Sequence, residues 1–107
     1  MKYDIDYFIN KFEAIPDENW GINNFVLGNK CCAYGHCGVV FNTGETLESK
    51  ALEEINKLLP NYGFLGHFTR INDGLNHDYK QETPKTRILA ALNDIKNNSC
   101  NSIKIKV

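Results

Sequence analysis

The sequence contains no long run of apolar residues, and this absence argues against a membrane-spanning protein. A helix that crosses a bilayer needs roughly 18 or more consecutive, mainly apolar residues, and no stretch of the chain approaches that length. The first residues, Met1 to Asp6, also lack the apolar block of a secretion signal. We therefore expect a cytoplasmic location and no membrane partner.

A strong excess of charge is missing as well, because the formal net charge at pH 7 is −1. Proteins that bind nucleic acids through their phosphates usually carry a clear positive excess. The chain also has neither a glycine-rich phosphate loop nor a dinucleotide fingerprint. We expect no nucleic-acid partner and no cofactor.

The composition is otherwise that of an ordinary folded domain, with 42% apolar and 23% charged residues in a chain of 107. A chain of this length can build one modest hydrophobic core. We expect residues 1–107 to form a single domain.

Three segments have the spacing of an amphipathic helix. In residues 4–16, apolar side chains recur at helical intervals, Asp4 is suited to the N-cap, and a proline closes the run. Residues 83–97 begin with a threonine cap followed by Pro84 at the first helical position. Residues 47–59 are the clearest case, with one apolar face. That face comprises Leu47, Ala51, Leu52, Ile55, Leu58 and Leu59.

Two further patterns predict a small sheet. Residues 25–32 resemble a hairpin, because Gly28 at the first loop position accepts the positive φ of a tight turn. In residues 103–107, apolar side chains alternate with two lysines, as in a strand with one buried face. The hairpin is the natural partner of that strand. With a fourth, short helix over residues 32–40, the sequence predicts an α+β fold: three to four helices packed on a small antiparallel sheet made of the hairpin plus the C-terminal strand.

The remaining long segment, residues 61–82, is predicted as a structured connection with a turn at Asn72-Asp73-Gly74. Trp20 follows a proline-containing turn and is expected to anchor the core, since a buried tryptophan removes a large apolar area from water.

The stretch Lys30 to Gly38 concentrates reactive side chains, with three of the four cysteines and one histidine. If it is helical, Cys32 and His36 lie one turn apart on one face, where the imidazole could stabilise a thiolate. A cysteine enzyme also needs a group that orients the histidine and donors for an oxyanion, and Asp73, Asn72, His67 or His77 could contribute if the fold brings them near. The alternative is that the cysteines are small core residues in a tight helix contact. Without an export signal, we expect free thiols.

A zinc site within this stretch is disfavoured, because neighbouring residues on a helix point about 100° apart and zinc requires four ligands in a tetrahedral array. The alternative is a zinc site that includes His67 or His77 as a ligand. Our expectation is that the protein has no metal site.

Aromatic side chains near the glycine-containing segments favour a pocket for a small planar ligand or a groove for a protein. The candidate ligand-binding residues are Trp20, Tyr34, His67 and Asn72. Core packing would explain the aromatic residues equally well.

Several short motifs follow one another along the chain: Trp20, Cys32-Ala33-Tyr34-Gly35-His36, Ile71-Asn72-Asp73 and a final amphipathic helix that starts at Thr83-Pro84. Their order resembles that in a family of small bacterial and phage proteins of unknown function. The family has a tryptophan, a Cys-Ala-Leu-Gly motif and an aliphatic-Asn-Asp motif, and Tyr34 stands where it has leucine. The resemblance implies a phage or prophage origin and brings no established activity.

Two functions from different classes remain. The first is a small non-enzymatic binding or regulatory protein that acts on a host protein or a small ligand, which we expect because no complete catalytic set is visible. The alternative is a cysteine-dependent enzyme that uses Cys32 with His36. The C-terminal strand would also allow two copies to pair as a homodimer.

Overall fold

The computed structural model describes residues 3–22, 26–39, 44–59 and 66–106. Five α-helices and one two-stranded antiparallel sheet occur in these ranges, which confirms the α+β class. In chain order the elements are α1 (Ile5–Glu13), a short 3₁₀ helix η1 (Asp17–Asn19), β1 (Val26–Leu27), β2 (Lys30–Cys31), α2 (Ala33–His36), α3 (Leu47–Asn56), α4 (Phe68–Asn72) and α5 (Pro84–Lys106).

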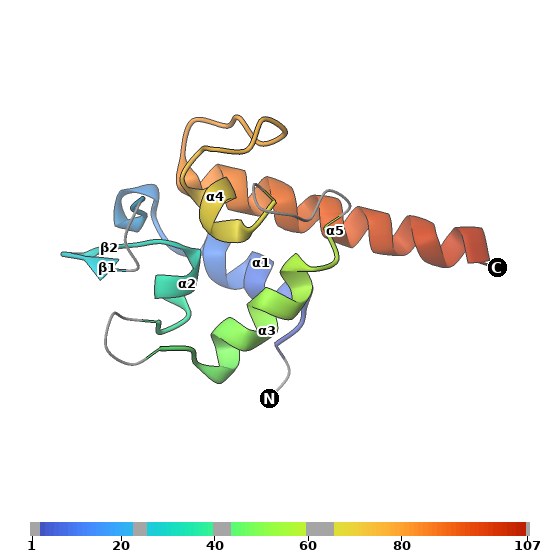
Figure 1. Cartoon of the computed structure of the whole chain (residues 1–107), viewed down its shortest axis with the longest axis horizontal. Helices are drawn as coiled ribbons and strands as arrows, with labels where there is room; N and C mark the ends of the chain where they lie inside the picture. Colours follow the sequence, from blue (N-terminus) through green and yellow to red (C-terminus); the bar gives the residue numbers. More distant parts are fainter. Residues whose placement is uncertain (1–2, 23–25, 40–43, 60–65, 107) are drawn as a thin grey trace.

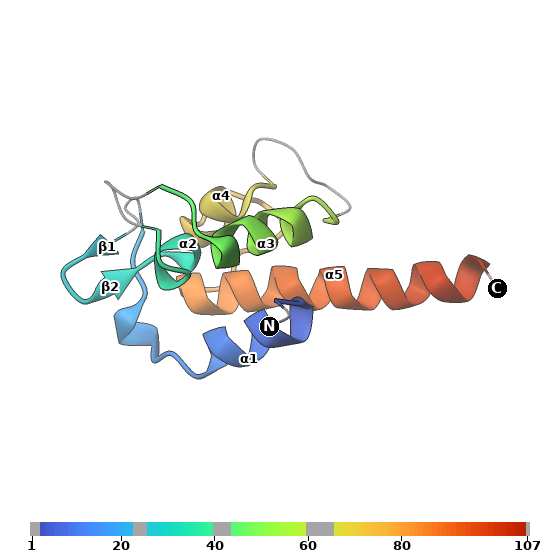
Figure 2. The same ribbon diagram turned by 90° about the horizontal axis from the view of Figure 1, so that it is seen from below.

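The long helix α5 is the central element of the fold. In Figure 2, α1 lies along one side of α5, while α2, α3 and α4 lie on the other side. The C-terminal part of α5 extends beyond the remaining elements, and the small hairpin lies at the opposite end of the molecule (Figure 1). The fully buried side chains come from α1, α3, α4 and α5, so one core joins the two sides of α5. They include Phe8, Phe12, Leu52, Phe68, Ile71, Ile88, Leu92 and Ile95.

Helix α1 forms where the sequence predicts it. The Asp4 side chain accepts a hydrogen bond of 2.9 Å from the Tyr7 amide, which satisfies one of the free N–H groups at the start of the helix. The helix ends at Glu13, so Ile15 lies outside it. Trp20 is 3% exposed and packs edge-to-face on Phe12, in agreement with a role as core anchor.

The predicted hairpin is also present. Val26 pairs with Cys31 and Leu27 with Lys30, and Gly28 adopts a φ of +65° at the turn. Phe25, which we assigned to the first strand, lies outside the described residues. Cys31 additionally forms a parallel bridge with Trp20.

The predicted C-terminal strand is wrong. The backbone continues as α5 through Lys106 instead of ending near Asn97, and the described sheet contains only β1 and β2. Val107 lies outside the described residues. No glycine or proline occurs between residues 98 and 106 to end the helix, and a short alternating segment is compatible with a helix when nothing interrupts it.

Two helices differ from their predicted extent. Helix α2 spans only Ala33–His36 because Cys32 is its N-cap in an extended conformation, and Gly38 takes a φ of +93° just after it. Helix α3 begins as predicted after Thr46 but ends at Asn56, and Leu47 at its start is 77% exposed. The residues of α3 itself that are buried are Ser49, Leu52 and Asn56, so the buried face shares only Leu52 with the predicted apolar face and carries two polar residues.

A buried polar network replaces part of the apolar core at the end of α4. Asn72 accepts from the Ala33 amide over 3.2 Å and donates to the Gly21 carbonyl over 2.8 Å. The guanidinium of Arg87 on α5 donates to the carbonyl oxygens of Ile71 and Asn72, at 3.1 and 2.8 Å. A side chain of α5 therefore supplies donors to the last two carbonyl groups of the short helix α4.

Candidate functional site

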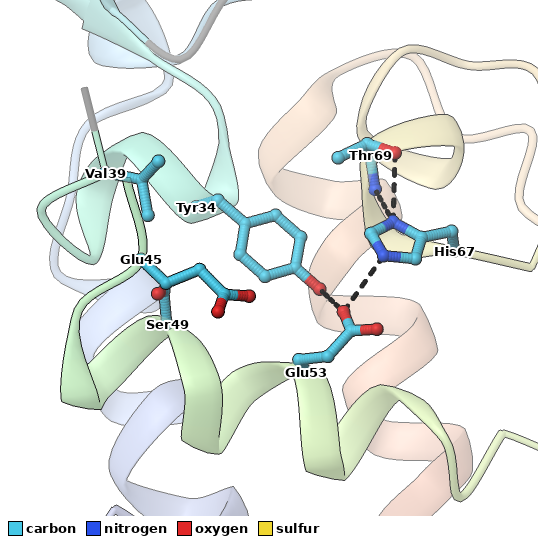
Figure 3. A pocket seen from close by; sticks show the side chains of 7 residues that line it. All are labelled: Tyr34, Val39, Glu45, Ser49, Glu53, His67 and Thr69. Carbon is cyan, nitrogen blue, oxygen red and sulfur yellow. Dashed lines mark hydrogen bonds and ion pairs between the residues drawn. The ribbon is translucent and has the colours of Figure 1, made fainter. Parts of the chain in front are cut away.

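A pocket of about 200 Å³ lies between α2, α3 and α4 (Figure 3). It is the clearest candidate for a functional site because it combines a hollow with a connected set of polar side chains. The described lining residues are Tyr34, Val39, Glu45, Ser49, Glu53, His67 and Thr69.

The start of α3 fixes one wall of the pocket. Thr46 and Ser49 form a capping box, in which each side chain accepts a hydrogen bond from the other residue's backbone amide. The Thr46 hydroxyl also donates to the Cys37 carbonyl over 2.6 Å, which ties α3 to the end of α2. Glu45 precedes this cap and Glu53 lies two turns further on, so the position of both carboxylates depends on it.

A buried asparagine fixes the opposite wall. The side chain of Asn56 donates to the Gly66 carbonyl over 2.9 Å and accepts from the Phe68 amide over 2.8 Å. These two bonds hold the backbone on both sides of His67. Helix α3 therefore positions the histidine as well as Glu53.

Tyr34, Glu53 and His67 meet at one carboxylate oxygen. The Tyr34 hydroxyl donates to Glu53 Oε1 over 2.7 Å, and His67 Nε2 lies 2.9 Å from the same oxygen (Figure 3). The two rings are stacked, with centroids 5.6 Å apart and planes 26° from parallel. Three elements of the fold thus contribute one side chain each to a single cluster.

The second nitrogen of the imidazole defines the tautomer. His67 is the N-cap of α4, and its Nδ1 accepts a hydrogen bond of 3.2 Å from the Thr69 amide. An Nδ1 that accepts carries no proton, so the neutral ring has its proton on Nε2, the nitrogen that lies 2.9 Å from Glu53 Oε1. The Thr69 hydroxyl, 2.9 Å from the same Nδ1, then acts as a donor to it.

The predicted catalytic residues do not form a comparable cluster. Cys32 is 5% exposed, and burial together with the Asp73 charge raises the pKa of its thiol. His36 packs against Trp20, with ring centroids 4.6 Å apart, and burial lowers its pKa. A nucleophilic cysteine needs a lowered pKa, so these positions give the proposed Cys32 thiolate no support.

The predicted ligand-binding residues divide into two groups. Tyr34 and His67 line the pocket, whereas Trp20 and Asn72 lie in the core, where Asn72 is completely buried and bridges Gly21 to Ala33. The sequence reasoning missed the two carboxylates and Thr69. Glu53 is one of four glutamates between residues 45 and 54, and nothing in the pattern distinguished it from its neighbours.

Within the described ranges, no three residues of the types His, Cys, Asp and Glu are grouped so that they could hold a metal ion. The alternative zinc site with His67 or His77 therefore gains no support. None of the helices in the described part of the chain has both the length and the apolar character needed to cross a bilayer.

Comparison of the chain with protein-family models, curated proteins and solved structures finds no match. The resemblance to small bacterial and phage proteins, and the phage or prophage origin that it implies, stay predictions. The cytoplasmic location, the single domain, the homodimer and a host-protein partner stay predictions too.

Proposed function

We propose that this protein is a non-enzymatic binding or regulatory protein that takes a small polar ligand in the pocket between α2, α3 and α4. The observation that carries the proposal is the convergence of Tyr34 and His67 on one oxygen of Glu53 beside a hollow of about 200 Å³. Pockets with a few convergent polar groups are the usual form of small-ligand sites.

The energetics of the Tyr34–Glu53–His67 cluster favour a role in ligand binding in addition to one in the stability of the fold. The Tyr34 hydroxyl and His67 Nε2 replace part of the hydration that the Glu53 carboxylate loses on partial burial. The side chains of Glu53 and His67 are 26% and 30% exposed, so the cluster is accessible to a ligand while being partly shielded from water. Shielding strengthens the interaction of the carboxylate with a bound group.

The connections of α4 explain how binding would influence the rest of the molecule. His67 and Thr69 lie at the start of α4, and Asn72 at its end contacts both Gly21 and Ala33. Arg87 links the same end to α5. A ligand held between α3 and α4 would therefore stabilise contacts that reach α2 and α5, as a regulatory protein requires.

Binding is favoured over cysteine catalysis because the two candidate sites differ in access. The pocket is partly open, whereas Cys32 and Cys37 are buried and burial raises the pKa of both thiols, that of Cys37 to about 12. A thiol with a raised pKa is mainly protonated at neutral pH and is a poor nucleophile.

The test is to screen the ¹⁵N-labelled protein by NMR against a library of small amines, acids and neutral compounds. We expect at least one compound to shift the amide signals of Tyr34, Glu45, Glu53 and Thr69 while it leaves the hairpin residues 26–31 unchanged. At about 100 times its Kd such a ligand would also stabilise the fold by about 2.7 kcal/mol. If no member of the library shifts the pocket amides, the proposal fails.

A further inference from the structure

We propose that the ligand is a small organic cation, a protonated amine or a guanidinium compound. This inference rests on the proposed function and concerns the chemistry of the same pocket. The charged side chains that line its described part are the carboxylates of Glu45 and Glu53, and His67 is their only ionisable neighbour there apart from Tyr34. Neither lysine nor arginine occurs among these lining residues.

The hydrogen-bonding groups of the pocket are arranged for a ligand that donates. The Tyr34 hydroxyl donates to Glu53 Oε1, and His67 Nε2 faces the same oxygen at 2.9 Å. The Thr69 hydroxyl donates to Nδ1 of His67, so its oxygen offers lone pairs only. Ammonium and guanidinium groups carry several N–H donors and no acceptor, and they therefore match this pocket.

The Tyr34 ring supplies a third feature that favours a cation. In Figure 3, the Glu45 carboxylate points toward this ring from one side, and Glu53 lies at its hydroxyl end; His67 stacks against the ring. A cation close to an aromatic face is stabilised by about 0.5–2 kcal/mol. An aromatic ring between two carboxylates combines this attraction with direct charge pairing.

The size of the pocket restricts the ligand. A volume of about 200 Å³ is below the range of about 300–1,000 Å³ that is typical of small-molecule pockets. This accommodates an amine with a short carbon chain and excludes full burial of a nucleotide or a folded peptide. An anionic ligand of the same size would have to approach two like charges, which costs free energy.

The experiment compares putrescine, butanediol and succinate, which share a four-carbon chain and carry two positive charges, no charge and two negative charges. Agmatine and butylamine are added as further cationic probes. The probes are titrated into the full chain, and pocket amide shifts and Kd are measured by NMR. We expect a cation to bind at least about tenfold more tightly than butanediol, with no pocket shift from succinate.

Matched variants show which carboxylate is responsible for binding the cation. Glu45→Gln and Glu53→Gln should each weaken binding of the tightest cation at least about threefold. Glu54→Gln makes the same chemical change on the same helix, but the Glu54 side chain is 72% exposed and pairs with Lys57, so binding should be retained. Glu45 is exposed, and Glu45→Gln therefore tests the inference even if Glu53→Gln fails to fold.

The outcomes separate the two proposals. If butanediol or succinate shifts the pocket amides at concentrations where no cation does, the cation inference is overturned while a small-ligand site stands. Equal weakening by Glu54→Gln and Glu45→Gln would likewise overturn it, because the charge of the pocket would then have no special effect. If none of these probes and no library compound shifts the pocket amides, both proposals fail.

Discussion

Tyr34 and His67 are stacked, with ring centroids 5.6 Å apart; the Tyr34 hydroxyl donates to Glu53 Oε1, and His67 Nε2 lies 2.9 Å from the same oxygen. The two residues belong to α2 and to the start of α4, so the stack brings together parts of the chain that are distant in sequence. Glu53 on α3 completes the contact. The geometry of the pocket therefore depends on three separate elements being in place.

Replacing Tyr34 with phenylalanine should separate the role of the hydroxyl from that of the ring. Tyr34→Phe keeps the stack and removes the 2.7 Å hydrogen bond to Glu53, which should lower the free energy of unfolding by about 1 kcal/mol. It should also change the affinity for the tightest cation, because Glu53 loses one of its donors. Urea denaturation and NMR titration measure the two effects.

The matched control is Tyr79→Phe, which removes a similar 2.8 Å hydrogen bond to Asp94 away from the pocket. It should cost a comparable amount of stability and leave cation affinity unchanged. Equal changes in affinity for the two variants would show that the effect comes from general loosening of the fold.

Asn72 should be among the polar residues most important for stability. Asn72→Ala leaves the Ala33 amide and the Gly21 carbonyl without their side-chain partner in a completely buried position. Each unsatisfied buried group costs about 1–3 kcal/mol, so we expect a loss of about 2–5 kcal/mol in urea denaturation. Asn93→Ala, which removes an exposed 2.9 Å bond to Leu89, should cost less than about 0.5 kcal/mol. Similar losses for the two variants would contradict this role of Asn72.

The thiol of Cys32 should be unreactive at neutral pH. Burial raises its pKa, so the thiolate fraction is small, and the sulfur is also hidden from reagents. Peptide-resolved iodoacetamide labelling of the native protein should show Cys32 reacting more slowly than a free thiol and more slowly than the half-exposed Cys31. Faster labelling of Cys32 than of a free thiol would restore the cysteine-enzyme hypothesis.

Acid should destabilise the fold through His36. Burial lowers its pKa below the usual 6.5, so the unfolded chain takes up a proton at a higher pH than the folded one. The stabilising contribution is complete above about pH 6.5 and is lost as the pH falls through the lower folded value. Between pH 6.5 and the lower pKa of the folded state, the urea midpoint of His36→Gln should therefore fall less steeply with decreasing pH than that of the unchanged protein.

Fluorescence offers an independent readout of the same group. Trp20 is the single tryptophan of the chain, and its ring centroid lies 4.6 Å from that of His36. A change in its emission as His36 protonates should have a midpoint below 6.5, and the change should disappear in His36→Gln. A midpoint above 6.5 would show that His36 is better stabilised as a cation than its burial implies.

The parts of the fold that were predicted correctly depend on local signals. Asp4 caps α1 and Gly28 adopts the positive φ of the hairpin turn, and each outcome follows from the residue itself. Local signals of this kind did not predict where α5 ends. Alternating isoleucines and lysines near residue 103 fit a short strand, but a helix already stabilised by tertiary packing continues until a residue interrupts it.

The pocket was only half predictable for a related reason. Tyr34 and His67 were expected at a ligand site because of their residue type, whereas Glu53 acquires its role from the side chains that the fold places around it. The spacing of Cys32 and His36 indicated a pair on one helix face. In the structure the helix begins after Cys32, whose extended backbone makes it the N-cap, and burial raises the pKa of its thiol.

The link between Arg87 and α4 has a consequence for the order in which the protein is assembled. A helix of five residues does not persist alone in water, and the carbonyl groups at the end of α4 are satisfied by a side chain that is synthesised fifteen or sixteen residues later. During translation, the histidine side of the pocket therefore lacks this support until Arg87 has been added to the chain. Ligand recognition would consequently distinguish finished molecules from nascent chains.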